Sequence, residues 1–274
     1  MTDLLVGVVL ALTVLIYAVD ISAYAARLAG VRTRRPMQAR SIYNLLALSS
    51  RAANAVQTTL LAGLVDRAVA NGITTELTAY LRLVLLAAAA GVVAGAVFVP
   101  SLARLLAQAV RSYERRGPPL GRSLPRVLLQ GLRIEVLPRA REELRRPRPS
   151  ALLWASQHRV PRRWILLTMV VTAFYAVGGP AAQVASALIP QGARTALSLS
   201  AYFNGMGTIL MVLFVDPITA RTVDLALQGE RPASDVTLIT VWQIGGRLTG
   251  IMLAQLALTP VARVFALVAD GLVR

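Results

Sequence analysis

The chain has 274 residues, 56% of them hydrophobic, with a mean hydropathy of +0.61 and a formal net charge of +16. This composition is too apolar for a soluble domain of this length, and the absence of cysteine excludes disulfides and cysteine-ligated metal sites. All 29 basic residues are arginine. Such a charge balance suits nucleic acid or anionic membrane lipid, and the long apolar runs favour membrane lipid and argue against nucleic acid.

Six runs of the sequence are long and apolar enough to be membrane helices, which need about 20 residues each. The first run is not expected to be a cleaved signal, because Asp3 stands where a positive charge would be and the run is too long. The sequence therefore predicts an all-α, polytopic membrane protein. The predicted spans are 4–26, 41–65, 76–103, 164–189, 196–218 and 236–259.

A long basic segment separates the third predicted span from the fourth. It contains Gly117-Pro118-Pro119 and several further prolines, so it cannot form one continuous helix. Its scattered aliphatic residues predict short amphipathic helices on the membrane surface. The expected organisation has three parts, which are a membrane unit 1–104, a basic cytoplasmic linker 105–163 and a second membrane unit 164–274.

The placement of arginine predicts the orientation. The loops after the first, third and fifth spans hold 22 arginines, whereas the opposite side holds four. By the positive-inside rule the arginine-rich loops are cytoplasmic, so both termini are expected outside.

An internal repeat relates the two membrane units. Six pairs of similar residues recur in order, and every offset falls between 158 and 160. Because each unit has three spans, the two copies must enter the bilayer from opposite sides, which is the inverted-repeat architecture of many transporters. The pairs are Tyr17 with Tyr175, Tyr43 with Tyr202, Asp66 with Asp224, Thr78 with Thr237, Gly91 with Gly250, and Pro100 with Pro260.

Charged residues stand at membrane depth in this arrangement. At 1.5 Å per residue, Arg51 and Arg247 lie about 15 and 16 Å above the cytoplasmic ends of their helices, near the centre of a core about 30 Å thick. Asp20 lies about 10 Å above the inner edge, within reach of Arg51. The two arginines predict a cationic site for an anionic group, since the guanidinium fork suits phosphate. The alternative is a buried ion pair between Asp20 and one arginine that only holds helices together.

Other polar residues within the spans are candidates for the same site. Asp20 is either a counter-ion or a proton carrier, and Asp216 is a second candidate for that role or a residue that ends or kinks its span beside Pro217. The amides are candidates for contacts with sugar or peptide groups, the alternative being hydrogen bonds between helices. They are Asn44, Asn54, Gln57, Asn204 and Gln243.

Sequence motifs for hydrolytic or metal chemistry are absent. There is no GxxxxGK[ST] phosphate loop, no HExxH and no cluster of cysteine and histidine, and no nucleophile is paired with a base. We therefore expect no enzyme activity, no cofactor and no metal site.

The run Ala26-Arg27-Leu28-Ala29-Gly30-Val31-Arg32-Thr33-Arg34-Arg35, followed by Asn44, Arg51, Asn54 and Gln57, resembles the Amj family, bacterial lipid II flippases that can substitute for MurJ. The second half is similar at Asn204-Gly205, Asp216-Pro217 and Gly246-Arg247. The resemblance implies a transporter in the bacterial cytoplasmic membrane that moves undecaprenyl-pyrophosphate-linked disaccharide-pentapeptide from the inner to the outer leaflet.

The expected mechanism is alternating access, in which the two halves rock and expose the Arg51/Arg247 site to each side in turn. Arg32, Arg34 and Arg35 are expected to recruit the pyrophosphate and anionic lipid on the cytoplasmic side. Two alternatives remain open, which are a transporter of another polyprenyl phosphate or small anion, and a membrane scaffold that uses the basic loop. A homodimer is expected because six helices enclose little space for so large a head group.

Overall fold

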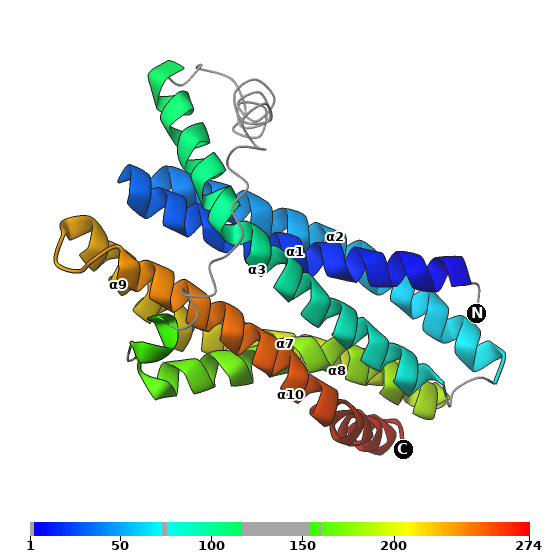
Figure 1. The fold of residues 1–274 in the computed structure, drawn as a ribbon. Coiled ribbons are helices and arrows are strands. Elements are labelled where there is room, and N and C mark those ends of the chain that lie inside the picture. The colour runs from blue at the N-terminus through cyan, green and yellow to red at the C-terminus, as the bar shows by residue number, and fades with distance from the viewer. Residues whose placement is uncertain (1–2, 73–75, 117–153, 159) are drawn as a thin grey trace.

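The computed structural model describes residues 3–72, 76–116, 154–158 and 160–274, and over these residues the fold is built from helices alone (Figure 1). Three long helices precede the segment 117–153, which lies outside the described residues, and the remaining helices follow it. The first are α1 Asp3–Thr33, α2 Pro36–Ala70 and α3 Leu77–Arg116. The later elements are α7 Arg162–Leu188, η2 Pro190–Gly192, α8 Ala193–Leu210, the π-helix η3 Met211–Val215, α9 Asp216–Gln228 and α10 Ser234–Val273.

Helices α1, α2 and α3 form one triplet around α1. Antiparallel α2 is joined to α1 by two buried contacts, in which the Ser50 hydroxyl donates to the Ile16 carbonyl and the Gln57 amide to the Thr13 hydroxyl. Parallel α3 approaches α1 so closely at Gly91 that an added Cβ would stand 2.5 Å from the Val14 carbonyl oxygen. Such contact between backbones is the use of small residues in packed membrane helices.

The second triplet, made of α7, the α8–α9 segment and α10, has the same internal arrangement. The antiparallel contact of α8 with α7 includes a hydrogen bond of 2.6 Å from the Tyr175 hydroxyl to that of Thr208. Parallel α10 meets α7 at Gly250, where an added Cβ would stand 2.6 Å from the Met169 carbonyl oxygen. In both triplets the first helix is therefore the central one.

The two triplets run in opposite directions. Arg27 of α1 contacts Gln243 of α10, and the earlier Asp20 contacts the later Arg247, so these two helices are antiparallel. Figure 1 shows the same relation, since α1 starts at the end of the molecule where α10 finishes. One apolar core of residues from all three helices of the first triplet continues into α7, α8 and α10.

The corner between α1 and α2 is very tight. Arg34 has a φ of 55°, the Arg34 amide donates to the Val31 carbonyl and the Arg35 amide donates to the Gly30 carbonyl, which together make a Schellman ending for α1. Pro36 then starts α2, where its missing N–H costs nothing. Only Arg34 and Arg35 lie between the two helices.

The fifth predicted span contains a π-helix. Pro217 has no amide to donate to Leu213, and the chain widens over Met211–Val215 just before it. The Val215 carbonyl there accepts from the Trp164 indole at 3.3 Å and from the Thr219 hydroxyl at 3.1 Å. The helix therefore continues through Asp216-Pro217 as α9 instead of ending there.

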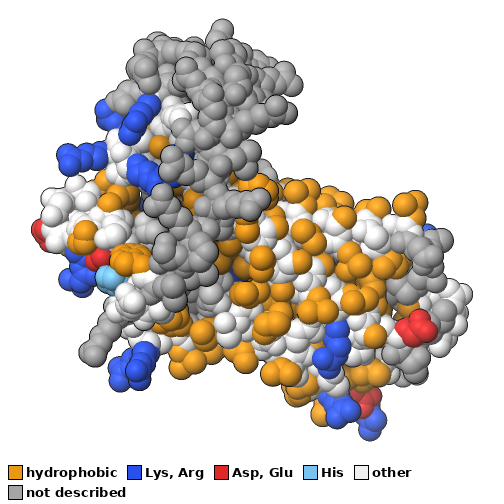
Figure 2. Space-filling view, viewed as in Figure 1, with side chains coloured by type: hydrophobic (Ala, Val, Ile, Leu, Met, Phe, Trp, Pro, Cys, Tyr) orange, Lys and Arg blue, Asp and Glu red, His pale blue; other side chains and the backbone are white. Residues whose placement is uncertain are grey.

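Five segments of the described chain are long and apolar enough to cross a membrane. They include α1, α3, α7, the α8–α9 segment and α10. Helix α2 is long enough but carries too many polar residues to be counted with them. Figure 2 shows a broad hydrophobic surface over the middle of one face, with charged side chains gathered toward the ends. The chain is thus a multi-pass membrane protein.

The predicted linker lies mostly outside the described residues. The amphipathic helices expected within 105–163 would fall there, while α3 continues to Arg116. Near the end of this segment, the Ala155 carbonyl accepts from the Trp242 indole at 3.3 Å and so contacts α10.

Candidate functional site

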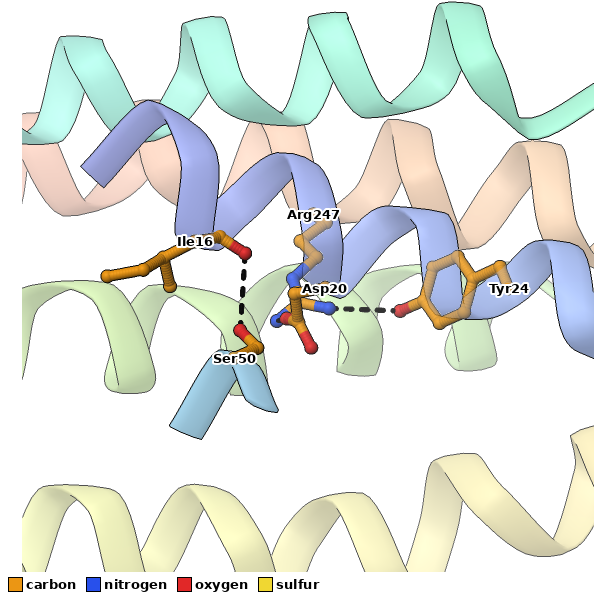
Figure 3. Close-up of polar contacts among 5 residues, drawn as sticks. All are labelled: Ile16, Asp20, Tyr24, Ser50 and Arg247. Atoms are coloured by element: carbon orange, nitrogen blue, oxygen red, sulfur yellow. Dashed lines mark hydrogen bonds and ion pairs between the residues drawn. The ribbon is translucent and has the colours of Figure 1, made fainter. Parts of the chain in front are cut away.

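An ion pair joins the two triplets in the middle of their helices. Asp20 of α1 and Arg247 of α10 are in direct contact, and a second guanidinium nitrogen of Arg247 donates to the Tyr24 hydroxyl at 3.2 Å (Figure 3). The side chain of Asp20 is 26% exposed and that of Arg247 is 23% exposed. The pair is therefore neither on the open surface nor sealed in the core.

Residues of α1 and α2 surround this ion pair. Figure 3 shows the hydrogen bond from Ser50 to Ile16 on the side of the pair where α2 passes. Tyr17 interacts electrostatically with both members of the pair, and so does Tyr43 of α2. The ion pair thus lies where three helices from two triplets come together.

A second polar contact between the triplets lies two helical turns along α1. The Arg27 guanidinium donates to the Gln243 side-chain oxygen at 2.6 Å, and the Gln243 amide donates to the Thr219 hydroxyl of α9 at 3.4 Å. The Arg27 guanidinium carbon is also 5.2 Å from the centre of the Tyr24 ring and 5.9 Å from that of Tyr43. These distances are within the range of cation–π attraction.

The structure brings some of the predicted site residues together and leaves others apart. Asp20, Gln243 and Arg247 belong to the contacts just described. Asp20 takes Arg247 as its partner, whereas Arg51 is exposed on α2 and has no ion pair or hydrogen bond within the described ranges. A helical sequence gives the face of a residue but not which neighbour that face meets, so either arginine was possible for Asp20.

The predicted amides divide in the same way. Gln57 is 7% exposed and its hydrogen bond to Thr13 lies within the first triplet. Asn44 and Asn54 are exposed on the same helix as Arg51, and Asn204 is exposed on α8. Gln57 therefore holds α2 against α1, while the three asparagines remain accessible.

The remaining predicted residues lie toward the arginine-rich end of the molecule. Asp216 is exposed at the start of α9 and interacts electrostatically with Arg27 and Arg40. Arg32, Arg34 and Arg35 are exposed at the corner between α1 and α2. In the described part of the chain, no three acidic or histidine side chains gather in a way that could hold a metal.

Arg27 and Tyr24 are members of this site that the sequence analysis did not select. Arg27 was counted with the loop after a span that was predicted to stop at residue 26, whereas α1 continues to Thr33. The signal was present in the spacing, because Asp20, Tyr24 and Arg27 follow one another at intervals of four and three and share one helical face.

A sequence model of the family described as "Amj: Alternate to MurJ" matches residues 12–269. The chain belongs to the Amj family. The resemblance inferred from the sequence is therefore confirmed, and the Asp20–Arg247 and Arg27–Gln243 contacts lie within the part that the Amj model matches.

One curated relative of this chain carries a name that states a function. The protein "Lipid II flippase Amj" of Bacillus subtilis (strain 168) is 28% identical over 246 residues, which are 90% of this chain and 90% of that protein. No solved structure matches the chain.

Proposed function

We propose that this chain is a lipid II flippase of the bacterial cytoplasmic membrane, which carries the undecaprenyl-pyrophosphate-linked precursor from the inner to the outer leaflet. The observation that carries this proposal is the set of charged contacts between two oppositely directed triplets, in a chain similar over 90% of its length to a protein named as a lipid II flippase. Transport between leaflets needs no nucleophile or cofactor, so an enzyme activity is not part of the proposal. No contact among the described residues favours a scaffold or a different anion.

The proposed architecture has six spans in two inverted repeats. Helix α2 is taken as the sixth span because it is 35 residues long and lies along α1. The equivalence of the triplets is supported by their matching contacts, since Gly91 packs on α1 as Gly250 packs on α7. Pro100 and Pro260 also fall inside the corresponding helices α3 and α10. In transporters of this architecture the substrate binds near the midplane, where the repeats meet.

The proposed substrate site combines the ion pair with the exposed face of α2. Arg51 and Arg247 supply guanidinium groups for the pyrophosphate, and the exposed asparagines Asn44, Asn54 and Asn204 offer donors and acceptors to the sugar and peptide groups. Arg51 is an exposed cation at the predicted membrane depth without a protein partner among the described residues, and such a residue is costly unless it faces water or an anion. The polyprenyl tail remains in lipid in this scheme.

The way the triplets meet supports alternating access. The Asp20–Arg247 and Arg27–Gln243 contacts between them join side chains, whereas within each triplet the helix backbones approach one another closely. We propose that the triplets rock as units and that Asp20 releases Arg247 when the pyrophosphate binds, with Asp216 as a second counter-ion nearer the cytoplasm. A dimer is part of the proposal because a single six-helix unit is small for this head group.

The proposed orientation places both termini outside. The described arginines Arg32, Arg104, Arg162 and Arg231 lie at the end of the molecule where α1 ends and α10 begins, which is cytoplasmic by the positive-inside rule. Arg32, Arg34 and Arg35 are exposed there and would recruit the anionic substrate and anionic lipid.

Lipid II transport by an Arg51→Ala/Arg247→Ala double variant tests the site. Purified protein is placed in vesicles, and the movement of labelled lipid II between leaflets is measured against the native chain at equal incorporation. We expect a loss of at least about 100-fold, since two charge-assisted contacts to phosphate are removed. An Arg263→Ala variant, which removes an exposed charge at the opposite end, is the matched control. Native transport by the double variant would refute the site.

A further inference from the structure

Arg27 differs from Arg247 in its charge balance. Arg247 has Asp20 as an ion-pair partner, whereas Arg27 makes no ion pair with any residue that the structure describes. Asp216 acts on Arg27 electrostatically but lies beyond ion-pair distance. Arg27 is therefore a partly exposed cation on which Asp216 acts only from beyond ion-pair distance.

The guanidinium of Arg27 is nevertheless held in one position. It makes a single hydrogen bond, to Gln243, and Gln243 is 2% exposed and bonded in turn to Thr219. The rings of Tyr24 and Tyr43 lie close to it, from α1 and α2 respectively. A guanidinium has five N–H donors, so most of the fork remains available for an anion.

Arg27 also lies between the cytoplasm and the ion pair. It is seven residues after Asp20, which is about 10 Å nearer to the arginine-rich end of the molecule. Tyr24 links the two places, because its hydroxyl accepts from Arg247 while its ring contacts Arg27. An anion that comes from the cytoplasmic leaflet would meet Arg27 before it meets Arg247.

We propose that Arg27 is the residue that first binds the pyrophosphate of the lipid substrate, aligned by Gln243 and by the rings of Tyr24 and Tyr43. The pyrophosphate accepts hydrogen bonds from the free side of the guanidinium fork, and the Asp20–Arg247 pair lies next along the path. The substrate class follows from the proposed function, on which this inference rests, and is a polyprenyl pyrophosphate. The guanidinium fork can bind phosphate or carboxylate with two hydrogen bonds, which chloride cannot match, and the larger negative charge of a diphosphate favours it over a single carboxylate.

Binding of undecaprenyl pyrophosphate to the purified full-length protein in nanodiscs tests this proposal. We expect Arg27→Gln to weaken the apparent affinity about tenfold and Arg27→Lys, which keeps the charge but loses the fork, to weaken it by a smaller factor. Arg221→Gln removes an exposed arginine of α9 at the same end and is expected to bind within about twofold of the native chain. Inorganic pyrophosphate and undecaprenyl monophosphate separate recognition of the diphosphate from recognition of the lipid.

A second variant keeps the test valid if Arg27→Gln does not fold. Gln243→Glu is nearly the same size and places a carboxylate on the Arg27 guanidinium, so it should block the anion and weaken binding about as much as Arg27→Gln. Native affinity in both variants would overturn the proposal.

If the native protein binds the pyrophosphate through Arg27 but does not move lipid II, the proposed function fails and this inference stands. If it moves lipid II and the Arg27 variants bind normally, this inference alone fails.

Discussion

Three arginines on the membrane helices, Arg27, Arg51 and Arg247, have three different environments. Arg247 is paired with Asp20, Arg27 is held by an amide and two aromatic rings, and Arg51 is exposed. Transfer of a guanidinium into a low-dielectric interior is costly, and Asp20 offsets that cost for Arg247, whereas Arg51 needs water or an anion. The sequence indicated that Arg51 and Arg247 stand at membrane depth, because depth follows from counting residues along a helix.

Their partners could not be predicted from the sequence. The choice of Arg247 over Arg51 by Asp20 depends on how α1, α2 and α10 are rotated against one another, and periodicity does not contain that information. Arg27 was missed for a related reason. Hydropathy marks the apolar part of a helix, and α1 continues past it until the Schellman ending at Arg34.

Replacing one member of the Asp20–Arg247 ion pair should destabilise the protein more than replacing both. Asp20→Asn leaves Arg247 without its counter-charge, while Asp20→Asn/Arg247→Gln replaces the pair by neutral groups of similar size. We expect a coupling of about 1–3 kcal/mol in a double-mutant cycle, below the value of a sealed pair because about a quarter of each side chain remains exposed. Thermal unfolding of the four proteins in detergent measures it, and additive effects would contradict the coupling.

At the scale of the helices, position is well predicted and extent is not. Each predicted span corresponds to a described helix, but α3 and α10 continue beyond residues 103 and 259, to Arg116 and Val273. Both helices continue through a proline near the predicted edge, Pro100 in α3 and Pro260 in α10, and helix formation does not end where hydropathy falls. The π-helix before Pro217 also could not be predicted from the sequence, because a helical pattern does not distinguish a widened turn from a kink.

The glycine contacts on α1 lead to a stability prediction. Gly91→Val would press a side chain into the Val14 carbonyl at 2.5 Å, a backbone atom that cannot move aside, so α3 must separate from α1. We expect a loss of about 1–3 kcal/mol in stability. Gly63→Val on α2, where nothing lies within 4 Å of the added Cβ, is the matched control. The melting temperatures of the two variants should differ clearly, and equal values would rule out the close contact.

At the scale of the whole molecule, the inverted repeat stays a prediction, and the described helices give the relative directions of the triplets. An odd number of spans per unit predicts that the two units enter the membrane from opposite sides. The contacts of Asp20 with Arg247 and of Arg27 with Gln243 show that α1 and α10 are antiparallel. The third helices also meet, where Arg82 of α3 donates to the Gln255 carbonyl at 3.2 Å and the Gln255 amide donates to the Arg82 carbonyl at 2.8 Å. This reciprocal contact lies away from the arginine-rich end, in the second half of α10.

Linking the triplets at this contact should stop transport. The chain has no native cysteine, so Arg82→Cys/Thr259→Cys can be joined by a bifunctional thiol reagent, at positions already linked by a hydrogen bond of 3.3 Å. We expect lipid II transport to be lost on cross-linking and kept without the reagent, because rocking needs this contact to open.

A cross-link inside one triplet is the control. In Thr168→Cys/Gly246→Cys the two Cβ positions are 3.3 Å apart, close to the separation found in disulfides, and both belong to helices proposed to move together. The oxidised form of this double-cysteine variant should still transport lipid II. Transport that survives the link between triplets would exclude rocking.

The two-residue corner at Arg34 and Arg35 limits the ways in which the site can open. The connection is short, and the buried hydrogen bonds of Ser50 and Gln57 hold α2 against α1, so the two helices are expected to move as one unit. In the proposed rocking motion we therefore expect Asp20, Arg27 and Arg51 to move together, so that the helices separate along α10.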